Sequence, residues 1–191
     1  NPEPLPENLK DLSNEVIKQK ADLGIAVDPD VDRLCFVCQD GSMFGEEYTL
    51  VAVADYVLSH TPGNTVSNLS STRALRDVTE QKGQKYHAAA VGEVNVVTLM
   101  KASKAVIGGE GNGGVIYPTS HYGRDALVRI ALFLTHLAKS GKDILSLRKS
   151  YPSYFISKNK IDLTPDLNID SLLKQVAEKY KNQPISTIDG V

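Results

Sequence analysis

The sequence lacks three features that would each assign it to a special class of protein. Its net charge is only −2, from 21 basic and 23 acidic residues, so no basic excess indicates a nucleic-acid or membrane-surface partner. No apolar run is long enough to span a bilayer, and no signal peptide is recognisable at the N-terminus. The 191 residues, 41% apolar and 23% charged, are typical of a soluble globular protein with one good core or two small ones.

Cysteine is also scarce. The two cysteines, Cys35 and Cys38, lie three positions apart on one predicted strand. A redox pair would need a helix N-terminus, and a zinc site would need a second pair of Cys or His ligands; neither is present. We therefore predict two reduced cysteines in the core, which agrees with a cytoplasmic location.

Hydrophobic periodicity predicts an α/β fold. A helix near residues 9–17 and a short buried strand at 24–27 precede an acidic loop, and a second strand follows at 34–38. Beyond a turn at Asp40-Gly41, helices and strands alternate. We expect helices at 46–60, 72–82, 94–102 and 125–140, and strands at 65–69, 86–91, 105–107 and 115–117. This alternation indicates an α/β domain over about residues 45–150.

Two helical segments carry a stripe of apolar side chains. In the helix opened by Asp125, the spacing predicts five inward residues: Leu127, Ile130, Ala131, Leu134 and Leu137. After Tyr154 a strand at 155–163 and a second such helix indicate another domain; the stripe of that helix comprises Ile169, Leu172, Leu173, Val176 and Tyr180. The chain opens on Asn1 and ends in a segment typical of a strand entering a turn, so we expect a piece of a longer protein.

Three carboxylates at alternate positions form the first candidate site: Asp28, Asp30 and Asp32. Mg²⁺ prefers oxygen ligands in near-octahedral geometry, and a tight loop stiffened by Pro29 can turn alternate carboxylates towards one centre. Their mutual repulsion requires a counterion. Arg33 follows directly, and its guanidinium suits a phosphate oxygen beside the metal.

The acidic loop permits two other interpretations. A solvated acidic turn is the simpler one, but the position between two apolar strands argues against it. A calcium-binding EF-hand loop also begins with alternate aspartates, but it needs Gly sixth and Glu twelfth, where this chain has Arg33 and Gln39.

A loop with five glycines in seven residues, at 108–114, forms the second candidate site. It contains the G-x-G-x-x-G spacing of dinucleotide-binding folds, but that motif should open a helix, whereas this loop runs into strand-like residues and Pro118. A backbone free to bend sharply can present Glu110 and Asn112, whose carboxylate and amide suit the hydroxyls of a sugar. A plain glycine-rich loop is the alternative.

Together the two loops resemble those of the α-D-phosphohexomutases: phosphoglucomutase, phosphomannomutase and phosphoglucosamine mutase. Residues 24–33 resemble the magnesium loop of that family, and residues 109–114 resemble its sugar-recognition loop. Residues 72–75 and 91–93 fall where the family has a strand–helix junction and a second substrate loop, and residues 123–126 resemble the start of its next helix.

The resemblance implies a mixed sheet flanked by helices, with partial flanking domains. Residues 1–44 would be the end of domain 2 with the metal loop, 45–153 the sugar-binding domain 3, and 154–191 the start of domain 4. The phosphoserine loop of domain 1 and the phosphate-clamping loop of domain 4 would lie outside the chain. The isolated chain should therefore be inactive.

The resemblance also implies an isomerase of carbohydrate metabolism that interconverts hexose 1-phosphate and hexose 6-phosphate through a phosphoserine and a hexose bisphosphate. The three aspartates would bind Mg²⁺. The substrate would contact Arg33, which steadies phosphate, and four residues of the other loops: Gly92, Glu93, Glu110 and Asn112. The preferred hexose and the oligomeric state are not implied.

The chain departs from the family pattern in its glycine-rich loop. Many members read Gly-Glu-x-Ser-Gly-His, and here Asn112 and Gly114 replace the Ser and the His. This variant is more similar to phosphoglucosamine mutases or archaeal-type mutases. The proton-transfer role of that His is left unassigned, with His121 as a nearby candidate.

Residues 119–121 match part of the family's phosphoserine loop, Thr-x-Ser-His-Asn-Pro. Tyr122-Gly123 replaces the Asn-Pro, so we interpret Ser120 as an ordinary loop residue. A metal-dependent phosphatase and a non-catalytic sugar- or metal-binding module are the alternatives. The phosphatase would need an aspartate nucleophile in its own loop, and no second motif supplies one.

Overall fold

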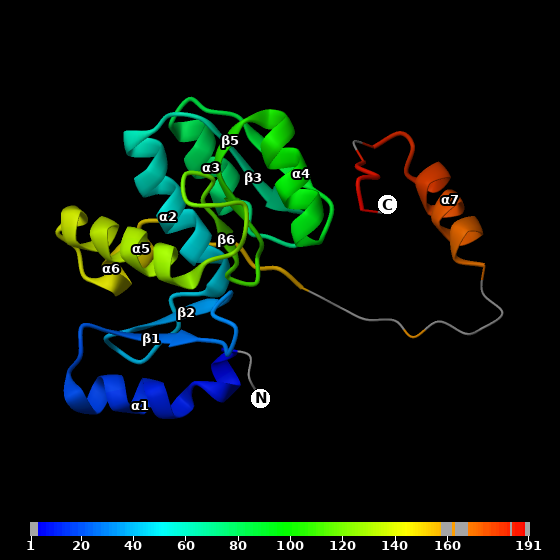
Figure 1. The fold of residues 1–191 in the computed structure, drawn as a ribbon. Coiled ribbons are helices and arrows are strands. Elements are labelled where there is room, and N and C mark those ends of the chain that lie inside the picture. The colour runs from blue at the N-terminus through cyan, green and yellow to red at the C-terminus, as the bar shows by residue number, and fades with distance from the viewer. Residues whose placement is uncertain (1–3, 158–161, 163–167, 184, 190–191) are drawn as a thin grey trace. The chain divides into compact units, whose positions relative to one another are not determined.

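The computed structural model describes residues 4–157, 162, 168–183 and 185–189. The chain divides into two compact units, Asn1–Tyr154 and Phe155–Val191 (Figure 1). The first unit contains all the predicted site residues. The observed elements confirm the predicted α/β class with a mixed sheet flanked by helices.

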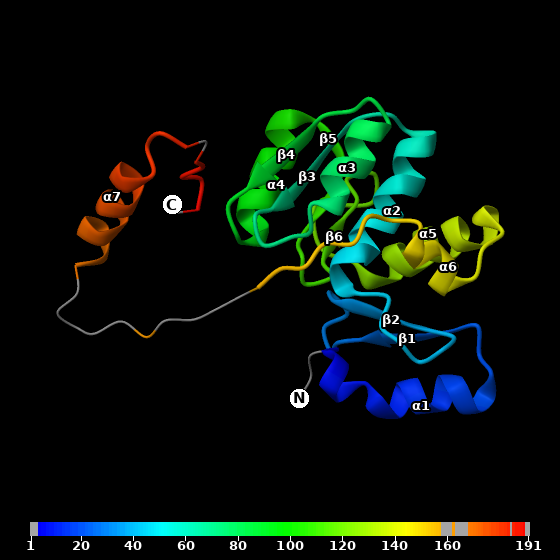
Figure 2. The same cartoon turned by 180° about the vertical axis from the view of Figure 1, so that it is seen from behind.

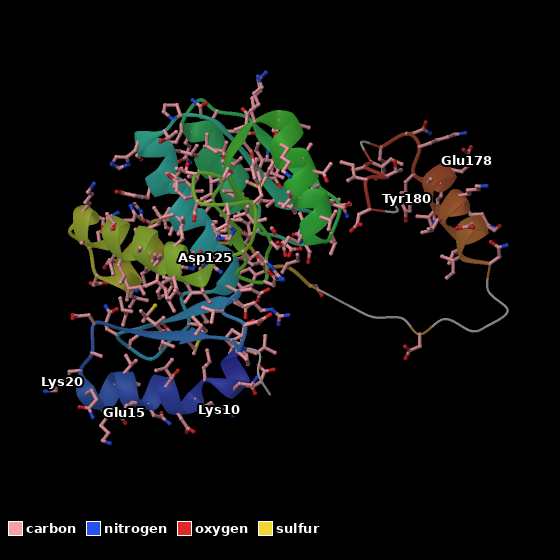
Figure 3. All side chains as sticks on the ribbon, viewed as in Figure 1. Lys10, Glu15, Lys20, Asp125, Glu178 and Tyr180 are labelled. Atoms are coloured by element: carbon pink, nitrogen blue, oxygen red, sulfur yellow. The ribbon has the colours of Figure 1, made fainter. Side chains whose placement is uncertain are left out.

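The first unit begins with a helix packed on a two-stranded sheet. A 3₁₀ helix (Pro6–Asn8) leads into α1 (Lys10–Gln19), which lies against the antiparallel strands β1 (Leu23–Val27) and β2 (Leu34–Cys38). Charged side chains labelled in Figure 3 lie along α1, Lys10 and Glu15, and at the residue that ends it, Lys20. Strand β2 is buried at every position and forms the floor of the main core.

The prediction of a buried strand at 24–27 is only partly right. Gly24 is buried so closely against α1 that a Cβ there would lie 2.7 Å from Val16 Cγ2. Ile25 and Val27 are 38% and 42% exposed. Because side chains alternate along a strand, these two lie on the face opposite α1, which is partly open among the described residues.

A four-stranded mixed sheet forms the centre of the first unit, in the order β4-β3-β5-β6. Strand β3 (Asn64–Asn68) is parallel to β4 (Tyr86–Ala89) and β5 (Ala105–Gly109), and β6 (Val115–Ile116) is antiparallel to β5. The three parallel strands therefore end at one edge, where Asn68 pairs with Ala89 and Ser67 with Gly109.

Helices cover both faces of this sheet (Figures 1 and 2). Helices α2 (Glu46–His60) and α3 (Ala74–Gln81) pack together, and α4 (Glu93–Ser103) packs on β3 and β5 from the other side. The arrangement follows from the strand order, because the chain moves outward from β3 to β4 and then back across to β5. Helix α2 is buried over most of its length, since it also contacts β2.

Helix α5 (Ala126–Ser140) joins the two sheets. Its first turn is capped by Asp125, whose Oδ1 accepts the N–H groups of Leu127 and Val128, and Gly141 ends it in the left-handed conformation. It packs on α2, and its Phe133 ring stacks on Phe36 of β2 at 3.9 Å. Helix α6 (Ile144–Lys149) follows.

The predicted inward face of α5 is wrong. Its buried residues are Ala126, Arg129 and Phe133, whereas Leu127 is 67% and Leu134 37% exposed. The predicted face of α5 contains more apolar side chains, but the face that packs against the core is the adjacent one, which includes Arg129. Of the five predicted residues, two are partly buried and pack on the core, Ile130 and Leu137, while Ala131 is exposed.

The second unit contains the predicted helix as α7 (Ile169–Lys179), whose first turn is capped by the side chain of Asn168. No residue of this helix is buried within the described part of the unit, and its apolar stripe is half-exposed. The strand predicted at 155–163 lies partly outside the described residues, and 155–157 have no regular secondary structure. Among the described residues, no helix combines the length and the apolar character that a membrane span requires.

Candidate functional site

The predicted site residues gather where the parallel strands end. Glu93 begins α4 after β4, and Glu110 follows β5. Arg124 pairs with both of these residues and with Asp32, and it thereby connects them to the acidic loop between β1 and β2. Asp125, labelled in Figure 3, caps α5 next to these residues. The carboxyl ends of parallel strands are the usual position for ligand sites in α/β proteins.

The acidic loop turns its three carboxylates towards one point. One oxygen from each of Asp28, Asp30 and Asp32 lies within 4.8 Å of the others. Asp28 is buried, and its Oδ1 accepts the N–H groups of Asp32 at 3.1 Å and Arg33 at 2.9 Å. Val31 adopts a left-handed φ of 59°, and its N–H bonds the Asp28 carbonyl at 3.1 Å. The protein backbone thus imposes the shape of the loop.

The loop carboxylates perturb one another. Burial raises the pKa of Asp32, and a hydrogen bond with Asp28 raises it further. The positive charge of the nearby Arg124 lowers this pKa, but the overall change is upward. Burial also acts to raise the pKa of Asp28, but the Arg33 amide, the Asp32 carboxyl and the Asp32 amide lower it overall. Carboxylates this close favour a shared proton unless a cation lies between them.

The donor set fits a hard metal ion. Three carboxylates converge in a small space, and Asp32 Oδ1 is buried with no hydrogen-bond donor among the described residues. Oxygen ligands of this kind suit a hard divalent cation. Arg33 lies beside them, with Nε 3.7 Å from Asp28 Oδ2 and 3.9 Å from Asp32 Oδ1.

The glycine-rich loop is a tight turn after β5. The Glu110 N–H bonds the Gly114 carbonyl at 2.8 Å, and the Gly114 N–H bonds Asn112 Oδ1 at 3.1 Å. Gly111 lies so close to the Ser70 carbonyl that a Cβ would approach it to 2.4 Å. Glycine is therefore required there by close backbone packing, and the amide oxygen of Asn112 is used within the loop.

Glu110 is buried and held from two sides. Its Oε1 accepts a hydrogen bond from Asn68 Nδ2 at 3.0 Å, and Asn68 is itself held by the Ser71 hydroxyl at 2.7 Å. Its Oε2 lies 3.6 Å from Arg124 Nη1. Sequence reasoning did not identify Asn68, whose only signal is its position at the end of a predicted strand.

Arg124 connects the two loops and was also missed. One guanidinium nitrogen pairs with Asp32 Oδ2, Nε donates to Glu93 Oε2 at 2.9 Å, and a third nitrogen faces Glu110. Its three partners come from separate segments, so no local pattern could reveal them. The one available signal is a basic residue directly before the helix cap Asp125.

Arg124 packs against Gly114, which replaces the family histidine. A Cβ at Gly114 would lie 2.4 Å from Arg124 Cδ, so a side chain at 114 and the observed Arg124 conformation exclude each other. His121 is half-exposed, with Nε2 3.1 Å from Asp125 Oδ2. Ser120 is exposed in the preceding turn.

The turn at residues 91–93, which was predicted as a second substrate loop, is defined by a glycine cap. Gly92 has a φ of 113°, and its carbonyl accepts the N–H groups of Asn95 at 3.1 Å and Val96 at 3.2 Å. This turn starts α4 and directs Glu93 to Arg124. A residue with a side chain would be strained at position 92.

The cysteines are not part of the site. Cys35 and Cys38 are both buried and free, as predicted, and burial raises the pKa of Cys35 to about 12. A thiol in this environment stays protonated and is a poor nucleophile.

Comparison with known families gives two matches. Residues 45–154 match the model for "Phosphoglucomutase/phosphomannomutase, alpha/beta/alpha domain III", and residues 1–41 match the model for domain II of the same proteins. The first match alone covers more than half of the chain.

Curated relatives carry related names. The chain is 35% identical over 192 residues to a phosphoglucomutase/phosphomannomutase of Thermococcus kodakarensis, covering 100% of this chain and 42% of the relative. It is 29% identical over 195 residues to a phosphoglucosamine/phosphogalactosamine mutase of Sulfurisphaera tokodaii, covering 100% and 43%. The chain thus spans less than half the length of these relatives.

A solved structure shows the same fold. A phosphoglucomutase/phosphomannomutase family protein of Burkholderia thailandensis superposes with a TM-score of 0.75 at 26% identity. The superposition covers 97% of this chain and 40% of that protein.

Proposed function

Because the chain belongs to the phosphoglucomutase/phosphomannomutase family, we propose that it is part of a phosphohexomutase, which interconverts hexose 1-phosphate and hexose 6-phosphate. The observation that carries this proposal is the convergence of the acidic loop and the Glu110 loop on one arginine, Arg124. A metal-binding group and a sugar-binding group must be adjacent in an enzyme that moves phosphate on a sugar. The buried, free cysteines agree with an enzyme of carbohydrate metabolism in the cytoplasm.

We assign residues 1–44 to the end of domain 2, 45–153 to domain 3 and 154–191 to the start of domain 4. The two family matches lie close to the first two of these ranges, and the compact unit ends at Tyr154. The phosphoserine that accepts and returns phosphate would come from another part of the full-length protein. The 191-residue chain without it should have no mutase activity.

The acidic loop would supply electrostatic stabilisation of phosphoryl transfer. Asp28, Asp30 and Asp32 would hold Mg²⁺, whose charge offsets the negative charge of the transferring group. Arg33 would hold a phosphate oxygen beside the metal, since a guanidinium matches phosphate geometry. The two backbone amides that donate to Asp28 Oδ1 would keep this carboxylate in place before the metal binds.

The substrate loops would hold the sugar. Glu110 is fixed by Asn68 and Arg124, yet each carboxylate oxygen has capacity for a second hydrogen bond, so it can accept sugar hydroxyls. Glu93, at the turn set by Gly92, provides a second such carboxylate. The oxygen of Asn112 is engaged by Gly114, so its NH₂ group would be the part available to substrate. Hydroxyl contacts of this kind tolerate both orientations of a hexose bisphosphate.

The test is an activity assay of the full-length protein with glucose-, mannose- and glucosamine-phosphates. Turnover should require Mg²⁺ and a catalytic amount of hexose 1,6-bisphosphate, and it should be absent from the 191-residue chain. Release of inorganic phosphate would instead indicate a phosphatase. Binding of hexose phosphate without turnover would indicate a binding module.

The metal role has its own test in the 191-residue chain. Calorimetry should detect Mg²⁺ binding that is lost in Asp30→Asn, because Asp30 is the exposed member of the triad and its substitution leaves the loop bonds intact. The control is Asp22→Asn, which removes one exposed carboxylate outside the loop. Equal Mg²⁺ affinity in both variants would disprove the ligand assignment.

A further inference from the structure

Arg129 is a charged residue in an apolar position. It is fully buried, at 0% exposure, on the core face of α5 with Ala126 and Phe133. The Phe133 ring next along this face stacks on Phe36 in the main core. The family assignment, the substrate loops and the metal ligands leave this arginine unexplained.

The guanidinium of Arg129 contacts the backbone of the proposed metal-binding loop. Its Nη2 donates to the backbone carbonyl of Asp32 at 2.8 Å. Its Nη1 lies 3.7 Å from the position that a Cβ of Gly113 would take, so it also borders the glycine-rich loop. Its Nε and Nη1 donate to no protein group within the part of the chain that the structure describes.

Helix α5 therefore holds two consecutive carbonyls of the loop. The Ala126 N–H bonds the Val31 carbonyl at 3.1 Å, and Arg129 bonds the next one, that of Asp32. Val31, whose carbonyl is the first of these two acceptors, adopts a left-handed φ of 59°, which is unfavourable for a β-branched residue. A strained turn of this kind persists only when its surroundings hold it in place.

Stability does not explain a buried arginine here. A guanidinium with one hydrogen bond loses more solvation than it regains, and an apolar side chain would fill the same face at lower cost. Burial lowers the pKa of Arg129 to about 10, while the charges of Asp32, Asp125 and Asp28 oppose that change. Arg129 thus stays charged at neutral pH, next to the carboxylates that form the metal loop.

We propose that Arg129 is a positioning residue for the metal-binding loop. It holds the Asp32 carbonyl so that the three carboxylates keep their convergent arrangement before the metal binds. This inference rests on the proposed role of the loop in binding Mg²⁺. It assigns to α5 the task of pre-forming the acidic loop through the carbonyls of Val31 and Asp32.

The proposal opposes what charge alone would predict. A positive charge near the carboxylates repels a divalent cation, so its removal should tighten Mg²⁺ binding if Arg129 acts only as a charge. If Arg129 positions the loop, its removal should weaken binding, because ordering the loop would then be part of the binding step. The sign of the change in affinity separates the two explanations.

The experiment compares Arg129→Met and Arg129→Lys with the parent 191-residue chain. Calorimetry measures the Kd for Mg²⁺, and hydrogen exchange without metal measures the amides of Asp32 and Arg33, which both bond Asp28. We expect Arg129→Met to weaken Mg²⁺ binding and to speed this exchange by about tenfold each, as for the loss of one charge-assisted hydrogen bond. Arg129→Lys should give a smaller effect, because it keeps the charge but not the fork.

Arg148→Met is the matched control. Arg148 also donates to a backbone carbonyl, that of Phe44 at 2.9 Å, but it lies on α6, outside both candidate loops. Its substitution should leave Mg²⁺ affinity and the exchange of the two loop amides unchanged. A general loosening of the fold would change them in both variants and would count against the proposal.

Unchanged or tighter Mg²⁺ binding in a folded Arg129→Met chain would overturn the proposal. Should circular dichroism show that this variant does not fold, Arg129→Lys decides by the same criteria. If the parent chain binds no Mg²⁺, the proposed metal function fails. The amide exchange then still tests whether Arg129 orders the loop, and unchanged exchange would disprove it.

Discussion

Arg124 shows how much of the site depends on one side chain. It is 17% exposed and meets carboxylates of three segments, those of Asp32, Glu93 and Glu110. Without it these negative charges would face one another at the strand ends. Such a group stabilises the folded chain through several partners at once, unlike an isolated surface ion pair.

The first prediction is that Arg124→Met destabilises the metal-free chain by about 2 kcal/mol in urea unfolding, because three part-buried carboxylates lose a common partner. Mg²⁺ should restore part of the loss by neutralising Asp32. Arg76→Met is the control, since Arg76 pairs with Glu80 on the exposed surface of α3, and it should change stability little. Equal effects of the two substitutions would contradict the bridging role.

The second prediction concerns Cys35 and Cys38. Because burial raises the pKa of both thiols, to about 12 for Cys35, the folded chain should react with an aromatic disulfide reagent only as it unfolds. Two thiols should react at once in guanidinium chloride. Rapid reaction of either thiol under native conditions would show that the β2 core is open.

At the scale of elements, α5 joins the site to a polar cluster at its other end. His136 Nε2 lies 2.8 Å from the Tyr151 hydroxyl, which in turn bonds Asp55 of α2 at 3.1 Å. This chain of bonds links α5, the segment after α6 and α2. Burial lowers the pKa of His136, although the Asp55 charge opposes that change.

The third prediction follows from this lowered pKa. The pKa of His136 is lower in the folded chain than in the unfolded chain, so the unfolded chain takes up a proton first as the pH falls. The folded state is therefore not penalised above the unfolded pKa, and it loses stability as the pH falls from the unfolded pKa towards the folded pKa. The midpoint temperature of thermal unfolding should therefore decrease as the pH is lowered from about 7.5 to about 5.

His136→Gln should flatten this part of the pH profile, because the variant lacks the group that takes up the proton. Thr135→Ser is the control, because Thr135 is an exposed neighbour on α5 that does not titrate in this range, and it should leave the slope unchanged. A pH profile identical in the His136 variant and the parent chain would exclude His136 as the source of acid sensitivity.

At the scale of the whole molecule, the proposed metal loop lies within the first compact unit, and α7 lies in the second. A ligand that binds only the folded state stabilises the unit that contains its site. The fourth prediction is that Mg²⁺ at about 100 times its Kd raises the unfolding free energy of the first unit by about 2.7 kcal/mol.

Amide exchange resolves this effect by position. Protection should increase in β2, α2 and the parallel strands and stay constant in α7. Asp30→Asn should abolish the increase. A uniform increase in protection over both units would indicate non-specific salt effects, which act on the whole chain.

Much of the fold and part of the site follow from short-range patterns. The strands around the acidic loop, the helix from Glu46 to His60 and the Asp125 cap were predicted because periodicity, capping and turn residues act within a few positions. The acidic loop and the glycine-rich loop were found for the same reason, since each contains its chemistry within seven residues.

The interactions between these segments required the folded chain. The partners of Arg124 lie up to 92 positions away from it in the sequence, and the buried face of α5 includes Arg129, which the predicted face did not. A charged side chain is predicted to be exposed when its partners are not known from the sequence. The partners of Arg124 and Arg129 come close to them only when folding brings the strand ends and the acidic loop together. Local sequence thus specifies which groups the site contains, whereas their pairing, and with it the electrostatics of the site, depends on contacts between distant segments.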